Sequence, residues 1–291
     1  MRASNDELTV VACHAMGTRF EMVGHGADPG RIRAALEAAA QEILEIHRRL
    51  SAFDPGSDIT EINEQAAQRP VRVDPRTLAL LLRCRALWTR TDGAFDVAVG
   101  GLMRRWGFRG EPPVTGEDSP RYGMDALTLN ADASTVQWTR PGVELDLGAI
   151  AKGHALDEAA AILRECGVSS ALLHGGTSSV LALGRDPGGL PWRVAVRDPR
   201  SPDDALAVVD LTDQALGVSA PHGRQVLADG REMGHIMDPR SGRPSAGLRL
   251  AAVSCPSAEE ADALSTAVQI LGPPFADRLS SQGYRVWVAE A

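Results

Sequence analysis

The segment from Pro29 to Leu50 restricts the fold of this chain more than any other feature of its sequence. Its apolar residues recur at spacings of three and four: Ile32, Leu36, Ala39, Ile43, Ile46 and Leu50. Such spacing places all of them on one face of an α-helix. The segment before it, LTVVACHAMGTRFEMVGHG, reads as two strands that are interrupted at Met16-Gly17-Thr18. We therefore expect a fold that mixes strands and long amphipathic helices.

Three further segments have the periodicity or the end signals of helices. They are a helix that begins after Asp74-Pro75 and ends near Thr91-Asp92-Gly93, one over residues 154–166 that Gly167 closes, and one over residues 257–271. In the last, Ser257 is the expected cap, Glu260 is its capping-box partner, and Gly272-Pro273-Pro274 is the stop.

Short strand-like pieces fill much of the remaining sequence. They surround Leu127 and Val136, continue as ALLHGG, SSVLALG and WRVAVRDP, and extend to Cys255 with a turn at DPRSGRP, residues 238–244. Strands mixed with long helices predict an α+β protein. A loop rich in Pro, Gly and acidic residues, 110–123, is the candidate boundary between two lobes of a chain of 291 residues.

Charge and hydropathy disfavour several classes of protein. The net charge is −8, with 38 acidic and 30 basic side chains, whereas nucleic acids and anionic membranes need basic patches. No apolar run approaches the roughly 18 residues of a membrane-spanning helix. The start, MRASNDELTV, lacks the pattern of a signal peptide, so we expect a cytoplasmic protein. Four scattered cysteines favour buried free thiols over a zinc site: Cys13, Cys84, Cys166 and Cys255.

The stretch LDLGAIAKGHALD, residues 145–157, joins a strand-like run to a helix-like one. Its glycines and alanines allow backbone amides to approach a ligand closely, and Lys152 adds a positive charge. This combination suits an anionic ligand such as a phosphate. It is also compatible with an ordinary tight connection.

The last predicted helix carries two oxygen-bearing side chains four residues apart. Asp262 and Thr266 therefore point to one face, with Ser265 beside them. Carboxylate and hydroxyl oxygens suit Mg²⁺. A solvated polar face is the simpler interpretation of such a pair, but the surrounding residues are apolar. A buried carboxylate needs a partner, and a cation would supply one.

His235 lies in a predicted strand just before the turn at 238–244. A lone histidine in this position is either a hydrogen-bonded structural residue or, next to a phosphate, a proton carrier or charge partner near neutral pH.

Several apolar residues are candidates either for the core or for ligand contact. GAFDVAVGGLMRRWGF offers Phe95 and Trp106 together with Asp96, and core packing is the favoured interpretation for Trp106. Phe53 in a Pro/Gly/Asp loop and Met16 at a strand break have less reason to be core residues.

The order of these motifs resembles that of the ApbE-type FAD:protein FMN transferases. The segments that carry the resemblance are MGTRFEM, LSAFDPGSDITEIN, DGAFDVAVGGLMRRWGF, LDLGAIAKGHALD, LHGGTSSVLALG, GHIMDPRSGRP and ADALSTAVQILG. They extend over roughly residues 10–275, and LDLGAIAKGHALD and HIMDPRSGRP are the most specific of them. The resemblance implies a single domain with an α+β, T-fold-like architecture of two lobes and a flavin site between them.

The resemblance also implies an activity. Members of this family use Mg²⁺ to split FAD, pass FMN to a Thr or Ser hydroxyl of a target flavoprotein, and release AMP. An FAD pyrophosphatase that gives FMN and AMP, and a flavin-binding protein without activity, are the alternatives. The FAD diphosphate carries about two negative charges, and charges 4 Å apart interact by roughly 4 kcal/mol at an effective dielectric near 20. Lys152 alone would therefore neutralise the diphosphate charge less well than Lys152 together with a divalent ion.

Residue roles follow from the resemblance as expectations. The metal ligands would be the Ala149 carbonyl, Asp262, Ser265 and Thr266. The FAD contacts would be Met16, Phe53, Ala94, Phe95, Asp96, Lys152, His235 and Ile236. His235 is the candidate for contact with the transferred phosphate or for proton removal, and Asp262 can share the latter role.

Two segments depart from the family pattern. Where the family has an Asn and an Asp flanking the Gly pair of LHGGTSS, this chain has His174 and Thr177. Where the family often reads Thr-Ser-Gly-Asp-Tyr, this chain reads VSAPH, residues 218–222. In the family the second segment lies toward the flavin or acceptor side, so this departure bears on acceptor choice more than on flavin binding.

Overall fold

The computed structural model describes residues 8–109, 122–198, 200–221, 225–228, 231–245 and 247–290. Its central element is a seven-stranded sheet in the order β1-β2-β6-β7-β10-β15-β16, in which all neighbouring strands are antiparallel. The strands are β1 (Thr9–Ala15), β2 (Thr18–His25), β6 (Ser170–Gly175), β7 (Ser179–Leu183), β10 (Gln214–Ser219), β15 (Leu248–Cys255) and β16 (Arg285–Glu290).

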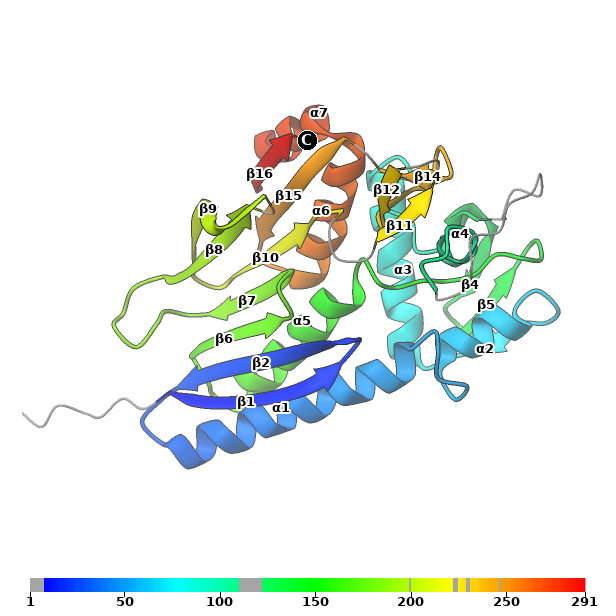
Figure 1. Ribbon diagram of the computed structural model, residues 1–291. Coiled ribbons are helices and arrows are strands. Elements are labelled where there is room, and N and C mark those ends of the chain that lie inside the picture. Colours follow the sequence, from blue (N-terminus) through cyan, green and yellow to red (C-terminus); the bar gives the residue numbers. More distant parts are fainter. Residues whose placement is uncertain are drawn as a thin grey trace, which may run out of the picture.

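Helices cover one face of this sheet, and a hairpin covers part of the other (Figure 1). The helices are α1 (Pro29–Leu50), α5 (Ala151–Glu165), α6 (Ala258–Leu271) and α7 (Pro273–Ser281). Their apolar residues and those of the sheet form the main hydrophobic core. On the opposite face, the hairpin of β8 (Trp192–Asp198) and β9 (Ser201–Leu211) forms a second core with β7, β10 and β15.

A smaller group of elements lies beyond one end of the main sheet (Figure 1). It contains α2 (Asp58–Gln65), α3 (Pro75–Arg90), α4 (Gly100–Arg105), the 3-10 turn η1 (Met124–Ala126) and a sheet of β3 (Val71–Arg72), β5 (Thr135–Trp138) and β4 (Leu127–Asn130). Two hairpins complete it: β11 (Gln225–Ala228) with β12 (Arg231–Gly234), and β13 (Met237–Asp238) with β14 (Arg243–Pro244).

The structure confirms the α+β class and the four predicted helices, with one informative shift. The helix expected over residues 154–166 begins at Ala151, so Lys152 and Gly153 lie in its first turn and not in the preceding connection. The tight turn is shorter than expected because the N–H groups of Ile150 and Ala151 both already donate to the Leu147 carbonyl, at 3.0 and 2.9 Å.

The ends of the last long helix agree with the expected cap but differ in two details. Ser257 caps α6 by accepting a hydrogen bond from the Glu260 N–H. The Glu260 carboxylate pairs with Arg90 and with the Tyr284 hydroxyl, so its side chain is engaged outside the expected capping box. Gly272, with a φ of 74°, ends α6 as predicted. The following prolines then start α7, because proline fits the first turn of a helix.

The remaining predictions have mixed outcomes. All four cysteines are free thiols, and Cys84 and Cys255 are buried. The lobe boundary expected at 110–123 lies mostly outside the described residues. Among the described residues, no helix combines the length and the apolar character needed to cross a bilayer.

Candidate active site

A pocket of about 740 Å³ opens where the first turn of α5, the middle of α6 and the β1–β2 turn meet the smaller group of elements. Its volume lies within the usual range for ligand pockets, about 300 to 1,000 Å³. Every residue that the sequence assigned to a site lines it: Met16, Phe53, Ala94, Phe95, Asp96, Ala149, Lys152, His235, Ile236, Asp262, Ser265 and Thr266. These residues come from distant parts of the chain, so the fold brings the whole predicted set to one place.

The Asp262 carboxylate faces the first turn of α5. One of its oxygens accepts a hydrogen bond from the Gly153 N–H at 2.8 Å, and the Ser179 hydroxyl lies 2.8 and 2.9 Å from the two oxygens. Only 6% of Asp262 is exposed. This burial raises the pKa of Asp262 to about 6, although Lys152, Ser179 and Gly153 act in the opposite direction.

Two hydroxyl groups lie one turn further along α6. Ser265 and Thr266 both donate to the Asp262 carbonyl, at 2.9 and 3.2 Å. The Ser219 hydroxyl of β10 lies 2.8 Å from the Ser265 oxygen and 3.2 Å from the Thr266 oxygen. A hydroxyl oxygen carries two acceptor lone pairs besides its hydrogen. The α6 hydroxyls can therefore donate to the carbonyl and still accept, or bind a cation.

This donor set fits a hard divalent cation. Within the described part of the chain, no three His, Cys, Asp or Glu side chains are grouped so that they could hold a metal. A metal at this place would depend on one carboxylate together with neutral hydroxyl and carbonyl oxygens, which is how Mg²⁺ is commonly held when substrate phosphates complete its shell. The raised pKa of Asp262 points the same way, because a cation offsets the cost of a buried charge.

Lys152 supplies positive charge near this carboxylate, and that charge acts to lower the pKa of Asp262. The Lys152 ammonium is 3.5 Å from the Gly148 carbonyl. Helix α5 has no side-chain cap from its own N-cap residue, Ile150. The Asp262 carboxylate takes the place of a local cap, because it accepts from the Gly153 N–H in the first turn of this helix. Asp146 shapes the turn by accepting from the Gly148 N–H at 2.9 Å.

A sequence model of the ApbE family matches residues 16–287. The chain belongs to the ApbE family. An FAD:protein FMN transferase of Rhodobacter capsulatus is 35% identical over 92% of this chain and 52% of its own length, so the chain spans about half of that relative. An FAD:protein FMN transferase of Escherichia coli is 28% identical over 92% of this chain and 79% of its own length.

A solved structure of an ApbE protein from Thermotoga maritima has the same fold. It superposes with a TM-score of 0.89 at 27% identity, covering 98% of this chain and 94% of that one. The α+β architecture expected from the resemblance is thus confirmed.

Two predicted contacts of this ApbE member lie in contrasting environments. Phe53 is 71% exposed at the pocket, and the Arg109 guanidinium lies 5.9 Å from its ring centroid. Asp96 is buried and accepts from the N–H groups of Ala98 and Met124 at 2.7 and 3.1 Å. Burial raises the pKa of Asp96 to about 6 despite these bonds. Phe53 is therefore free to meet a ligand, whereas Asp96 also holds the segment around Phe95 in place.

The structure corrects the prediction that His235 lies in a strand. It supports the prediction that Trp106 packs in the core. His235 was expected in a strand, but it lies in a bend between β12 and β13, beside the buried Ile236. The Ile236 carbonyl accepts from Ser245 at 2.7 Å, so regular pairing starts only after the bend. Trp106 packs against the Leu102–Phe108–Met237 cluster, and its indole N–H donates to Gly242 at 3.0 Å. Core packing is thus confirmed for Trp106.

The lining residues that were not assigned from the sequence include His47, Arg109 and Ser219. His47 of α1 accepts the Met16 N–H at 3.3 Å through its Nδ1. Arg109 donates to Asp146 at 3.1 Å, and Ser219 contacts the α6 hydroxyls. Their partners lie far away in the sequence. The positive φ of Met16, 51°, reflects the tight β1–β2 turn and is visible only in the structure.

Some of the residues that depart from the family pattern line the pocket, and His174 is not among the lining residues. Thr177, Val218 and Ser219 line the pocket. His174 lies on β6, opposite Glu21 of β2, and burial lowers its pKa. His222, the last residue of the second departure, lies outside the described residues.

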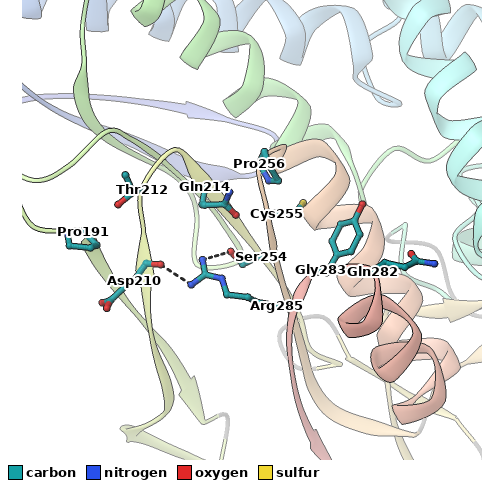
Figure 2. Close-up of a pocket in the computed structure, with 11 residues that line it drawn as sticks. Pro191, Asp210, Thr212, Gln214, Ser254, Cys255, Pro256, Gln282, Gly283 and Arg285 are labelled. Atoms are coloured by element: carbon teal, nitrogen blue, oxygen red, sulfur yellow. Dashed lines mark hydrogen bonds between the residues drawn. The ribbon is translucent and has the colours of Figure 1, made fainter.

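A second hollow, of about 610 Å³, lies among β9, β10, β15 and β16 (Figure 2). Arg285 there donates to the Asp210 carbonyl and to the Ser254 hydroxyl, both at 2.9 Å. None of the residues assigned from the sequence is among the described residues that line it. The chemistry of the chain therefore points to the larger pocket.

Proposed function

We propose that this chain is a Mg²⁺-dependent FAD:protein FMN transferase that moves FMN from FAD to a Thr or Ser hydroxyl of a target protein and releases AMP. The observation that carries the proposal is the contact between the buried Asp262 carboxylate and the Gly153 N–H, because Asp262 and the neighbouring Lys152 both line the pocket. The FAD:protein FMN transferases among the relatives support it.

The diphosphate of FAD would lie across the first turn of α5. The positive charge of Lys152 would attract it there. Asp262, Thr266 and the Ala149 carbonyl would hold Mg²⁺, with Ser265 assisting. When bound, the ion would polarise the phosphate oxygens and stabilise charge that develops on them. The protein itself would mainly position the groups, as in other phosphoryl transfers.

The chemical step needs one proton acceptor. The acceptor hydroxyl oxygen forms a bond to the FMN phosphorus while the bond from that phosphorus to the AMP oxygen breaks, and the hydroxyl proton leaves. His235 lines the pocket and can contact the transferred phosphate or take this proton. Asp262 can share the second role.

Other pocket residues would position the flavin nucleotide. Phe53 offers an exposed aromatic ring, and the Met16 and Ile236 side chains line the same cavity. Ala94, Phe95 and Asp96 form a fixed segment of its wall. These groups would hold FAD so that its diphosphate reaches Lys152.

A reconstitution assay tests the proposal. The protein is incubated with FAD, Mg²⁺ and a candidate flavoprotein subunit, and the products are AMP and an acceptor band that remains fluorescent after denaturation. AMP release without labelling of any of several acceptors would instead favour FAD pyrophosphatase activity. A bound yellow flavin with no AMP formed would favour a flavin-binding protein without activity. The altered segments at His174–Thr177 and 218–222 make acceptor choice the most sensitive part of this test.

A further inference from the structure

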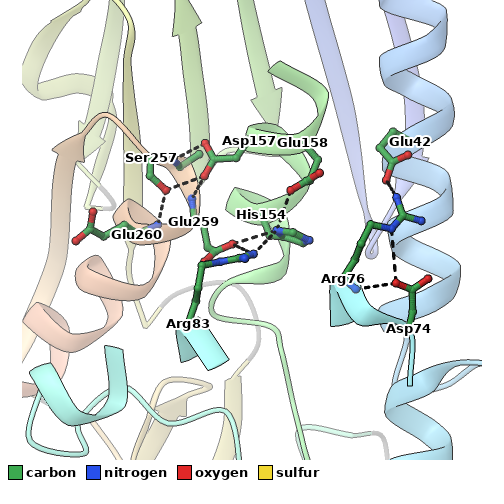
Figure 3. A network of polar contacts seen from close by, with 11 residues as sticks. Glu42, Asp74, Arg76, Arg83, His154, Asp157, Glu158, Ser257, Glu259 and Glu260 are labelled. Carbon is green, nitrogen blue, oxygen red and sulfur yellow. Dashed lines mark hydrogen bonds and ion pairs between the residues drawn. The ribbon is translucent and has the colours of Figure 1, made fainter. Parts of the chain in front are cut away.

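Helices α5 and α6 cap each other at their N-terminal ends. The first turn of a helix has N–H groups without partners in that helix. In α5 the Gly153 N–H donates to Asp262 of α6 at 2.8 Å. In α6 the N–H groups of Ala258 and Glu259 both donate to Asp157 of α5, at 2.9 Å each. Each helix therefore supplies the carboxylate that satisfies the start of the other (Figure 3 shows the Asp157 side).

A second carboxylate ties the same turn of α6 to α3 and, once more, to α5 (Figure 3). Glu259 accepts from Arg83 of α3 at 2.7 and 2.8 Å, and it lies 3.0 Å from Nδ1 of His154 on α5. The side chain of Glu259 is 9% exposed, whereas that of Arg83 is 46% exposed. Burial acts to raise the pKa of Glu259, but its bonds to His154 and Arg83 outweigh burial and keep the pKa below its ordinary value.

The backbones of the two helices touch at this place. A Cβ atom at position 153 would lie 2.1 Å from the Ala258 carbonyl oxygen, so only glycine permits the approach. On the other side of α6, a Cβ at position 217 of β10 would lie 2.6 Å from the Asp262 nitrogen. Asp262 is thus held between a strand and a helix in direct backbone contact, and a small shift of α5 would separate its carboxylate from Gly153.

We infer that Asp157 and Glu259 are positioning residues for the proposed Mg²⁺ site, because they hold α5 and α6 in the arrangement that places Asp262. The inference rests on the proposed function, since it concerns that site. Neither residue lines the pocket among the residues described. They act through the helices, and sites of this kind tolerate displacements of only about 0.5 Å. We call these two residues, with Arg83 and His154, the α5–α6 clamp.

Binding of Mn²⁺ to the full-length protein without FAD tests the inference, with free Mn²⁺ followed by electron paramagnetic resonance. We expect Glu259→Ala to weaken Mn²⁺ binding by about 10-fold or more, the usual effect of losing a residue that orients a metal ligand. Glu259→Gln should recover part of this loss, because its amide oxygen still accepts from Arg83. Asp157→Asn should weaken binding as well, and it provides the test if Glu259→Ala does not fold.

The matched control is Asp198→Asn, which removes a largely buried ion pair with Arg249, at 3.1 Å, away from the clamp. Glu259→Ala and Asp198→Asn should both lower Tm, but Asp198→Asn should leave the affinity for Mn²⁺ unchanged. A lower Tm with wild-type Mn²⁺ affinity in Glu259→Ala and Asp157→Asn would overturn the inference while the proposed function stands. A wild-type protein that neither binds Mn²⁺ nor releases AMP would overturn the proposed function too.

Discussion

Replacing Asp262 by asparagine should separate stability from function. The side chain keeps its size and an oxygen that can accept from Gly153, but it loses its charge. Burial raises the pKa of the carboxyl from 3.8 to about 6, and a difference of about 2 pKa units corresponds to roughly 3 kcal/mol in favour of the neutral form. This difference already includes the bonds from Ser179 and Gly153. Part of the gain disappears because an amide nitrogen replaces one of the two carboxylate oxygens that the Ser179 hydroxyl contacts. We therefore expect the metal-free variant to be more stable by about 1 kcal/mol at pH 7.5.

The sign of the pH dependence follows from the same pKa. The folded-state pKa of Asp262 lies above its unfolded value, so the charged carboxylate destabilises the metal-free protein above about pH 6. This contribution fades as the pH falls from about 6 toward the unfolded-state pKa of 3.8, and it is absent only below that value, where the group is protonated in both states. The Asp262→Asn variant lacks this contribution. The stability difference between variant and wild type should therefore shrink between pH 7.5 and pH 4.5.

Urea unfolding in EDTA at these two pH values measures the stability difference, and AMP release from FAD measures the function. Added Mg²⁺ should raise the Tm of the wild type, because a ligand that binds only the folded state stabilises it, and it should leave the variant unchanged. The reasoning is refuted if Asp262→Asn releases AMP at the wild-type rate, or if it is destabilised by several kcal/mol without metal.

Three further substitutions test other parts of the site. Lys152→Met should weaken FAD binding by about 10-fold, equivalent to about 1.4 kcal/mol; fluorescence titration measures it, and unchanged binding would exclude a diphosphate contact. Gly153→Ala should cost about 1 to 3 kcal/mol of stability, because its Cβ would lie 2.1 Å from the Ala258 oxygen; an unaltered urea midpoint would contradict the close packing. Phe53→Ala should change stability by less than about 0.5 kcal/mol, since the ring is 71% exposed, yet raise the KM for FAD; an unchanged KM would remove Phe53 from the binding site.

Local patterns in the sequence identified the helices and several chemical groups. The spacing of apolar residues gave α1 its observed bounds, Pro29–Leu50. The serine before the last helix gave its cap, Ser257. The spacing of four residues placed Asp262 and Thr266 on one face of α6. Periodicity and capping depend on neighbours within one or two turns, so they can be read without knowledge of the fold.

Tertiary packing decided what these groups face. The Gly153–Asp262 contact joins residues 109 positions apart, and the Met16–His47 contact joins residues 31 positions apart. No periodic pattern links such positions. The close approach of α5 to α6 at Gly153, permitted by the missing Cβ, brings a buried carboxylate beside Lys152. The residue types alone indicate which side chains carry the required oxygens and charge. Contact between two helix ends brings these side chains together, because only packing fixes the distances between distant segments.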